Sequence, residues 1–290
     1  YVKPFLRRVK GFLFILGGKG EEMKISADDI YKSVGKIRAV NPLIHNITNY
    51  VAMNNTANAL LAIGASPVMA HAAEEVKEMT TLAQALVINI GTLSSAWVRA
   101  MGEAFHTALK EGLPVIIDPV GAGATAYRTR TVRELLDTGH PAMIRGNASE
   151  IMSLADDRLK TKGVDSRSQS DEALRAARSI SEKNQCVVVV SGAVDYVVEG
   201  QDVVKVANGH PLMTRVTGLG CTASALCGAF AAVEEDALSA AVQAMALVGI
   251  AGELAVEKSA VPGSLQMHFL DCLYNMSAVE IQERLKVEVK

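Results

Sequence analysis

The chain has 290 residues, of which 49% are hydrophobic, and its formal net charge at pH 7 is -2. This length and apolar content are sufficient for a large buried core in one α/β domain. The near balance of acidic and basic residues argues against the broad positive surface typical of proteins that bind nucleic acid or membranes. Small-molecule chemistry is therefore the favoured class of function.

The four cysteines, Cys186, Cys221, Cys227 and Cys272, lack the paired spacing of metal sites, and a chain of this size needs no disulfides to hold its core. We therefore expect a reducing, cytoplasmic location. We also find no uninterrupted apolar run close to the roughly 20 residues that a membrane-spanning helix needs, so none is expected.

The first residues differ from the rest, because Arg7 and Arg8 precede the short apolar run 12–16 (FLFIL). This order hints at a signal peptide, but the run is shorter than the usual apolar region and no small-residue cleavage site follows. We expect residues 1–22 to be an extension outside the domain, with Met23 as the native start. Residues 23–290 carry no repeat and no linker, which predicts a single domain.

In chain order, the first clear element is an amphipathic helix, with apolar residues at helical spacing from Met53 to Leu61. Thr48 or Asn49 is expected to cap its start, and Gly64 to close its end. Five short apolar runs at helix-length intervals then predict strands: 67–70, 86–90, 115–118, 143–145 and 186–190. Such runs are typical of strands buried on both faces of a mostly parallel sheet with right-handed crossovers.

Two further extended runs, 196–198 and 203–206, flank Gly200 and predict a hairpin at a sheet edge. The Ala-rich segment from 221 to about 256 predicts two helices, and a final helix is expected over much of 269–285. In an open parallel sheet, ligands bind beyond the carboxyl ends of the strands. The residues that follow the predicted strands are rich in polar side chains and glycine, which predicts one cleft at that edge.

The run 217–221 (TGLGC) leads into a helix of small residues, so that backbone N–H groups and the positive end of the helix dipole converge. Gly218 and Gly220 permit the close backbone approach that an anion site demands. An ordinary glycine-rich turn is the alternative reading. Neither the P-loop motif nor the dinucleotide motif is present, so the pattern favours a phosphate-binding fold outside both groups.

Two carboxylates follow strands at the same edge, Asp118 before a glycine-rich turn and Glu150 at a helix start. They could hold Mg²⁺ through water, because this ion keeps much of its hydration and also binds phosphate oxygens. The forked guanidinium of Arg145 suits triphosphate oxygens. A turn-capping aspartate and a salt bridge are the structural alternatives for Asp118 and Arg145.

Six segments, in this order, resemble hydroxyethylthiazole kinases: 45–49 (HNITN), 64–69 (GASPVM), 89–93 (NIGTL), 118–123 (DPVGAG), 145–150 (RGNASE) and 218–221 (GLGC). The resemblance runs from about residue 24 almost to the carboxyl end. It implies a ribokinase-like fold, three α/β/α layers around a mostly parallel central sheet, and a homotrimer with active sites between subunits. It also implies ATP- and Mg²⁺-dependent phosphorylation of the hydroxyl of 4-methyl-5-(2-hydroxyethyl)thiazole in thiamine biosynthesis and salvage.

Residue roles follow from the same resemblance. It implies that the thiazole contacts Met69, Gly218 and Asn49. It implies that ATP contacts Arg145, Ser191 and Asn147. Asp118 and Glu150 match the acidic residues near the metal and phosphates, with water between them and the ion. The catalytic group is Cys221, which matches the residue facing the substrate hydroxyl, together with Gly218 and Gly220 of the anion site.

Two positions at this site have chemical consequences. Related sugar kinases carry an aspartate where this chain has Cys221, and a thiol must first become a thiolate to accept a proton. The start of a helix could lower the thiol pKa, but phosphoryl transfer relies chiefly on positioning and charge neutralisation, so we assign Cys221 a facilitating role. Leu219 stands where the family usually has Thr, which predicts reduced turnover with binding retained.

Three other functions share part of this sequence pattern. A repair dehydratase of the ribokinase-like superfamily would also use a glycine-rich anion site, but it would carry an aspartate at the position of Cys221. A thiazole-binding protein with poor turnover is the second alternative. A cysteine-nucleophile transferase would need a histidine paired with Cys221. His45 is expected to be structural, because it precedes a predicted helix start.

Overall fold

The computed structural model describes residues 25–155 and 166–289, and the predicted extension 1–22 lies outside these ranges. The strands are β1 (Leu43–Ile47), β2 (Ser66–Val68), β3 (Ala85–Asn89), β4 (Val115–Asp118), β5 (Met143–Asn147), β6 (Val187–Ser191), β7 (Asp195–Glu199), β8 (Asp202–Val206) and β9 (Val287–Val289). The helices are α1 (Ala27–Val40), α2 (Met53–Ile63), α3 (Val76–Leu82), α4 (Ser95–Glu111), α5 (Ala126–Thr138), α6 (Ala148–Leu154), α7 (Ser166–Asn184), α8 (Leu219–Ala231), α9 (Ala237–Lys258), α10 (Pro262–Asn275) and α11 (Ala278–Arg284), with a 3₁₀ helix η2 (Pro211–Arg215).

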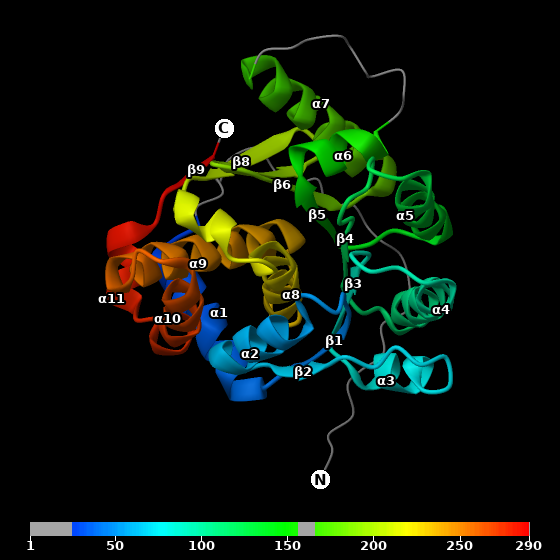
Figure 1. Ribbon diagram of the computed structural model, residues 1–290, viewed down its shortest axis with the longest axis horizontal. Coiled ribbons are helices and arrows are strands. Elements are labelled where there is room, and N and C mark those ends of the chain that lie inside the picture. The colour runs from blue at the N-terminus through cyan, green and yellow to red at the C-terminus, as the bar shows by residue number, and fades with distance from the viewer. Residues whose placement is uncertain (1–24, 156–165, 290) are drawn as a thin grey trace.

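All nine described strands form one sheet in the order β2-β1-β3-β4-β5-β6-β7-β8-β9. The pairs from β2 to β6 are parallel, and the pairs from β6 to β9 are antiparallel. Helices α3 to α7 lie on one face, while α1, α2 and α8 to α11 lie on the other (Figure 1). The predicted single α/β domain, with three layers and a mostly parallel sheet, is confirmed.

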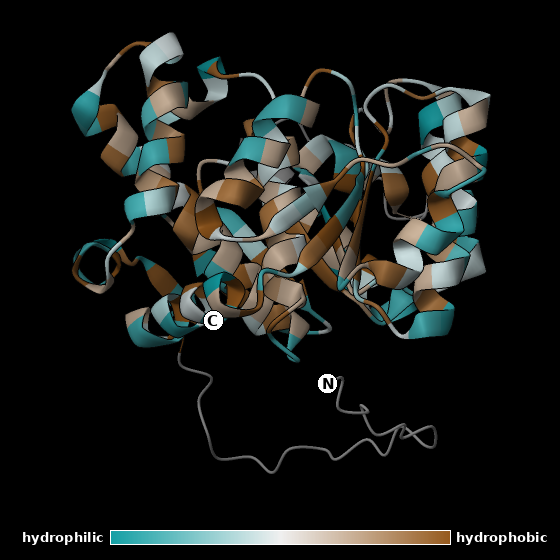
Figure 2. Cartoon of the chain, turned by 90° about the horizontal axis from the view of Figure 1, so that it is seen from below, coloured by the Kyte–Doolittle hydropathy of each residue, from teal (hydrophilic) through white to brown (hydrophobic). Residues whose placement is uncertain are grey.

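Alternation along the strands explains why both faces are covered. Val87 of β3 belongs to the apolar cluster under α8 and α9, whereas its neighbours Leu86 and Ile88 belong to the cluster under α4. Strands buried in this way need apolar residues at every position, which is the pattern of the predicted runs. Apolar residues accordingly gather in the centre of the molecule, with hydrophilic ones on the outer helices (Figure 2).

Helix α9 is the second of the two helices predicted for the Ala-rich segment. Its 22 residues are long and apolar enough to cross a membrane by length and composition alone, although Ser239, Gln243 and Glu253 interrupt the apolar run. Inside the fold, 83% of its apolar window is buried. Contacts with α8, α10 and the β6–β8 part of the sheet surround α9, which makes it a core helix of this domain.

Three predicted element positions were wrong. The hairpin β7–β8 is not at the sheet edge, because β9 pairs with β8 beyond it. The predicted final helix is two helices, since Ser277 starts a new one by accepting the N–H of Glu280 while the Glu280 side chain accepts the N–H of Ser277. Neither Thr48 nor Asn49 is the N-cap of α2, which is Ala52, and the Asn49 side chain instead accepts the Ala52 N–H at 3.0 Å.

Candidate active site

Side chains at the carboxyl ends of β1, β3 and β4 form a chain of buried hydrogen bonds. Asn49 follows β1, and its Nδ2 donates to Oδ1 of Asn89, the last residue of β3, at 2.8 Å. Asn89 Nδ2 in turn donates to Oδ2 of Asp118, the last residue of β4, at 2.7 Å. Because these strands are parallel neighbours, their ends meet at one edge of the sheet, as the sequence predicted.

Helix α8 closes this chain from the opposite side. Asn49 Nδ2 also donates to Sγ of Cys221 at 3.2 Å, and Ser224 Oγ donates to Oδ2 of Asp118 at 2.7 Å. Gly218 is the N-cap residue of α8, with a left-handed φ of 80° that favours glycine. We call Cys221, Asn49, Asn89, Asp118 and Ser224 the polar relay. It links the thiol at the start of α8 to the carboxylate of β4.

Arg145 lies against the first turn of α8. A Cβ added to Gly220 would lie 3.0 Å from Nη1 of Arg145, so the guanidinium is close to the backbone of the predicted anion site. The buried Nε of Arg145 has no hydrogen-bond partner among the described residues. A buried, unpaired guanidinium nitrogen is uncommon, and an anion bound at the start of α8 would give it a partner.

The ionisation of Asp118 reflects these surroundings. Burial raises the pKa of Asp118 to about 6, while the charge of Arg145 and the hydrogen bonds from Ser224 and Asn89 oppose this rise. The nearby charge of Glu150 raises the pKa further. The two carboxylates therefore repel each other, and a bound cation would relieve both the repulsion and the burial cost.

Glu150 has a structural role that the sequence analysis missed. Its Oε1 accepts the N–H of Gly121 at 2.8 Å, and its Oε2 accepts the N–H of Asn147 at 2.8 Å. The Asn147 side chain in return accepts the N–H of Glu150 at 3.0 Å, which completes a capping box at the start of α6. The Glu150 carboxylate thus joins the loop after β4 to the end of β5.

The acidic residues fit Mg²⁺ in one way only. Across the described ranges, no group of three or more His, Cys, Asp or Glu side chains could hold a metal ion. Asp118 and Glu150 already accept hydrogen bonds from protein donors, so an all-protein cage is not available here. Mg²⁺ usually keeps several waters and uses one or two carboxylates with substrate phosphates, and these two side chains match that requirement.

The surroundings of Cys221 disfavour ionisation of its thiol. Burial raises the pKa of the Cys221 thiol, the negative charge of Asp118 raises it further, and the hydrogen bond from Asn49 only partly offsets these two effects. The thiol stays protonated at neutral pH, which agrees with a facilitating role rather than proton abstraction.

The remaining predicted residues lie at neighbouring strand ends. Ser191 ends β6, opposite Asn147 of β5, and its Oγ donates to the carbonyl of Gly146 at 3.2 Å. Met69 follows the edge strand β2, next to β1, and its carbonyl lies 3.0 Å from Nδ1 of His71. The structure therefore spreads the predicted thiazole and ATP residues along the same edge, from β2 to β6.

Sequence reasoning left out Asn89, Ser224 and Arg128 as site residues. Asn89 ends a predicted strand, and Ser224 lies one helical turn after Gly220, so strand ends and helical spacing could have found both. Arg128 joins two site loops, because its Nη1 donates to the carbonyl of Val120 at 2.6 Å and its Nη2 to that of Gly91 at 2.7 Å. No sequence motif identifies Arg128, because it binds backbone carbonyls of loops that lie outside its own helix.

His45 is structural, as expected. It is fully buried in β1, its Nε2 lies 2.7 Å from the carbonyl of Ala70 and its Nδ1 lies 3.0 Å from Oγ1 of Thr80. Because a carbonyl only accepts, Nε2 carries a proton and donates to Ala70. Burial lowers the pKa of His45, which favours the neutral ring.

Comparison with known proteins identifies the family of this chain. The Hydroxyethylthiazole kinase family matches residues 34–279. A hydroxyethylthiazole kinase from Syntrophus aciditrophicus is 57% identical, over 91% of this chain and 98% of that protein. The structure of the hydroxyethylthiazole kinase protein from Pyrococcus horikoshii OT3 superposes with a TM-score of 0.83 at 44% identity, over 91% of this chain and 99% of the other.

A ribokinase-like superfamily protein from Enterococcus faecalis V583 is only 14% identical but has a TM-score of 0.59, over 83% of this chain and 87% of its own, which shows a shared fold. The family match spans most of the described domain, and the site residues stand at the strand ends where this fold binds ligands. The chain therefore belongs to the hydroxyethylthiazole kinase family, a family of ATP-dependent kinases, and has the ribokinase-like fold.

Proposed function

We propose that the protein transfers the γ-phosphoryl group of ATP to the hydroxyl of 4-methyl-5-(2-hydroxyethyl)thiazole, in thiamine biosynthesis and salvage. The polar relay beside the start of α8 is the observation that carries this proposal. It sets a thiol, two amides and a carboxylate at the place where backbone N–H groups face an anion. That combination suits an alcohol next to a phosphoryl group, and membership in the family supplies the substrate.

The phosphate end of the site is assigned to the start of α8. The N–H groups of the turn at Gly218 and Gly220 would receive the transferred phosphoryl group, and Arg145 would neutralise its charge. The support is the closeness of Arg145 to Gly220 and its buried, unpaired Nε. Asn147 and Ser191, at the ends of β5 and β6, are assigned to ATP.

The thiazole end of the site is assigned to Met69, Asn49 and Gly218. Asn49 donates both to Asn89 and to Cys221, so it holds the thiol in a fixed orientation toward the substrate hydroxyl. Because the Cys221 pKa is raised, the protonated thiol orients the alcohol and does not act as its base. The rate enhancement then comes from positioning and from charge neutralisation.

Mg²⁺ is the proposed metal, held through water by Asp118 and Glu150. When bound with ATP, the ion would neutralise the developing charge on the phosphates. The support is the mutual repulsion of these two carboxylates and the cost of burying Asp118. Chelation of the metal with EDTA is expected to abolish turnover, with recovery on addition of excess Mg²⁺, and full activity in EDTA would contradict this assignment.

We assign the protein to a cytoplasmic homotrimer with active sites between subunits. Tyr50 and Val51, directly after Asn49 of the site, expose 65% and 62% of their surface, and apolar side chains next to a ligand site are typical of an interface. All four cysteines are free, which suits a reducing compartment. Light scattering is expected to give about three times the 30.8 kDa chain mass, and an active monomer would contradict the assembly.

The proposed reaction is tested by a coupled ADP-release assay with the thiazole alcohol, a pyrimidine alcohol and a sugar. We expect the wild type to release ADP only with the thiazole alcohol. Cys221→Ala is expected to keep measurable activity, reduced by about 10- to 100-fold, because positioning contributes without being the main source of rate. Equal rates with all three alcohols would contradict the proposed substrate, and complete loss in a folded Cys221→Ala would contradict the facilitating role.

A further inference from the structure

The residues that lead into the anion site form a segment without long regular structure. Residues 207–217 connect the end of β8 to Gly218, and they contain only the short helix η2. We call this segment the strap. Because Gly218 is the N-cap of α8, the position of the strap determines where the backbone N–H groups of the anion site begin.

The strap lies unusually close to helix α9. A Cβ added to Gly249 would stand 2.5 Å from Cβ of Asn208 and 2.6 Å from its carbonyl carbon. No real Cβ tolerates such an approach to backbone, so this position of the strap requires glycine at 249. The contact fixes the start of the strap against the middle of α9.

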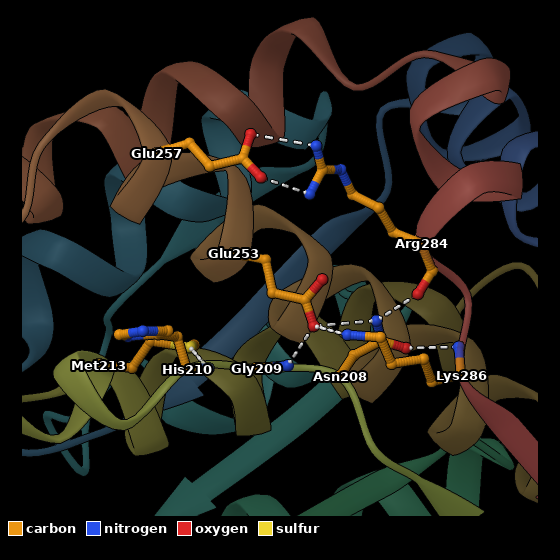
Figure 3. A network of polar contacts seen from close by, with 8 residues as sticks. All are labelled: Asn208, Gly209, His210, Met213, Glu253, Glu257, Arg284 and Lys286. Carbon is orange, nitrogen blue, oxygen red and sulfur yellow. Dashed lines mark hydrogen bonds and ion pairs between the residues drawn. The ribbon is translucent and has the colours of Figure 1, made fainter.

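One carboxylate of α9 then holds the strap by hydrogen bonds. Glu253 lies one turn after Gly249, and its side chain is only 12% exposed. Its Oε1 accepts the N–H of Gly209 at 2.9 Å, Nδ2 of Asn208 at 3.3 Å and Nζ of Lys286 at 3.0 Å. These three donors converge on the Glu253 carboxylate in Figure 3.

The carboxyl-terminal segment holds the strap from its other side. Asn208 Nδ2 donates to the carbonyl of Arg284 at 2.7 Å, and its Oδ1 accepts the N–H of Lys286 at 2.9 Å. The N–H of Ala207 donates to the carbonyl of Lys286 at 2.9 Å, which continues the β8–β9 pairing into the strap. Asn208 is therefore bound by both α9 and the segment that leads into β9.

We propose that Glu253, Asn208 and Lys286 form a clamp that positions the anion site for phosphoryl transfer. The clamp residues are positioning residues, since they act on the reacting groups through the strap. This inference rests on the proposed kinase reaction and assigns a role in it to the carboxyl-terminal segment. Misplacement of catalytic groups by about 1 Å can cost about 100-fold in rate, so loss of the clamp should lower kcat.

The test compares Glu253→Ala with Glu253→Gln and with a control on the same helix, Glu257→Ala. Glu257 pairs with the side chain of Arg284 at 2.7 Å, its own side chain is 58% exposed, and its dashed lines in Figure 3 run to Arg284 and not to the strap. Glu253→Ala removes every hydrogen bond of the clamp to α9, whereas Glu253→Gln keeps an oxygen acceptor for Gly209. Lys286→Met tests the clamp without altering α9.

For Glu253→Ala we expect kcat to fall about tenfold or more, with KM for the thiazole changed less than twofold. The kcat values of Glu253→Gln and Lys286→Met are expected to lie between those of Glu253→Ala and the wild type. The kcat of Glu257→Ala is expected to match that of the wild type. Hydrogen exchange should rise in residues 207–221 of Glu253→Ala and not of Glu257→Ala. All rates are measured well below the melting temperature of each variant.

Three results would overturn the clamp. They are a folded Glu253→Ala with kcat within twofold of the wild type, an equal loss of kcat in Glu257→Ala, or unchanged exchange across the strap. If Glu253→Ala does not fold, the kcat and hydrogen exchange of Glu253→Gln and Lys286→Met are judged by the same criteria. Failure of the proposed kinase reaction is recognised separately, because the wild type itself would then be inactive with the thiazole alcohol.

Discussion

Asp118 combines two opposing requirements in one side chain. It is 1% exposed, and burial raises its pKa to about 6, yet its proposed role beside the metal and phosphates requires a carboxylate at neutral pH. The charge of Arg145 and the hydrogen bonds from Ser224 and Asn89 reduce the free-energy cost of burying the ionised carboxylate, but they do not remove it. Such residues are typical of active sites, where function is maintained at the expense of stability.

Asp118→Asn is therefore expected to lower kinase activity by about 100-fold while stabilising the metal-free protein at pH 7 by about 2 kcal/mol. The folded-state pKa of Asp118 lies above its ordinary value of 3.8. Between about pH 4 and 6, Asp118 is therefore protonated in the folded protein but ionised in the unfolded chain. The stability of the wild type should fall as the pH rises through this window and level off above it.

Urea unfolding in EDTA from pH 4 to 7.5 measures this effect. Burial also raises the pKa of Asp195 to about 6, so Asp195 titrates in the same window, and Asp118→Asn should remove only part of the slope. Asp195→Asn is the matched control for the share of Asp195, while burial also raises the pKa of Glu199 and lowers that of His45, whose titration opposes the slope toward the upper end of this range. A variant at Asp118 that is less stable than the wild type at pH 7, with the slope unchanged, would contradict this explanation.

Leu219 receives a different interpretation from the structure than from the sequence. The prediction of reduced turnover assumed that a Thr hydroxyl at this position reaches the phosphate. The Leu219 side chain is 6% exposed and belongs to the apolar cluster between the sheet and α8 and α9. It therefore contributes to the core, which removes the structural reason for a lower rate.

Leu219→Thr is thus expected to leave kcat within about twofold and to lower the free energy of unfolding by about 1–3 kcal/mol, because a buried hydroxyl replaces apolar contacts. Steady-state kinetics and urea unfolding on the same preparation measure both effects. A clear rise in kcat would instead support the direct phosphate contact that the sequence suggested.

Among the elements, α8 packs closely on the sheet. It carries the anion site at its start and lies directly on the sheet, where a Cβ added to Gly228 would stand 2.7 Å from Cγ2 of Val87 and 3.3 Å from Cγ2 of Ile44. Both neighbours are β-branched residues in central strands, so their side chains have little freedom to move. Gly228 therefore sets the distance between α8 and the sheet, and through it the position of Cys221 relative to Asn49.

Gly228→Ala is expected to destabilise the fold by about 1–3 kcal/mol through overpacking, despite the better helix propensity of Ala. Gly102→Ala in α4 is the control, because an added Cβ there meets nothing within 4 Å. The control should be neutral or stabilising by up to about 1 kcal/mol. Urea unfolding of both variants compares them, and equal stabilities would show that close packing at Gly228 is unimportant.

The elements that sequence reasoning found and missed differ in a physical way. Buried strands such as β3, β4 and β6 are continuous apolar runs, so they were predicted from sequence alone. β9 has only three residues, Val287–Val289, and is mostly exposed, so its pairing with β8 depends on tertiary contacts that no local pattern records. The break between α10 and α11 depends on one capping serine inside a helix-like pattern.

On the scale of the whole molecule, the layered fold and the edge that holds the candidate site could be predicted, because ligands bind beyond the carboxyl ends of the strands in open parallel sheets and this sequence has polar residues and glycines there. The role of each side chain could not. Glu150 was expected to serve the metal and also caps α6, and burial and the charge of Asp118 raise the pKa of the Cys221 thiol. These outcomes depend on hydrogen-bond partners and burial, which only the folded chain defines.

The measurement that tests the central claim most directly is the stoichiometry of products from ATP and 4-methyl-5-(2-hydroxyethyl)thiazole, followed by ³¹P NMR and mass spectrometry. We predict one phosphorylated thiazole for each ADP formed, with no increase in inorganic phosphate. Release of ADP and inorganic phosphate without a phosphorylated thiazole, as a dehydratase of the same fold would produce, would contradict the kinase assignment.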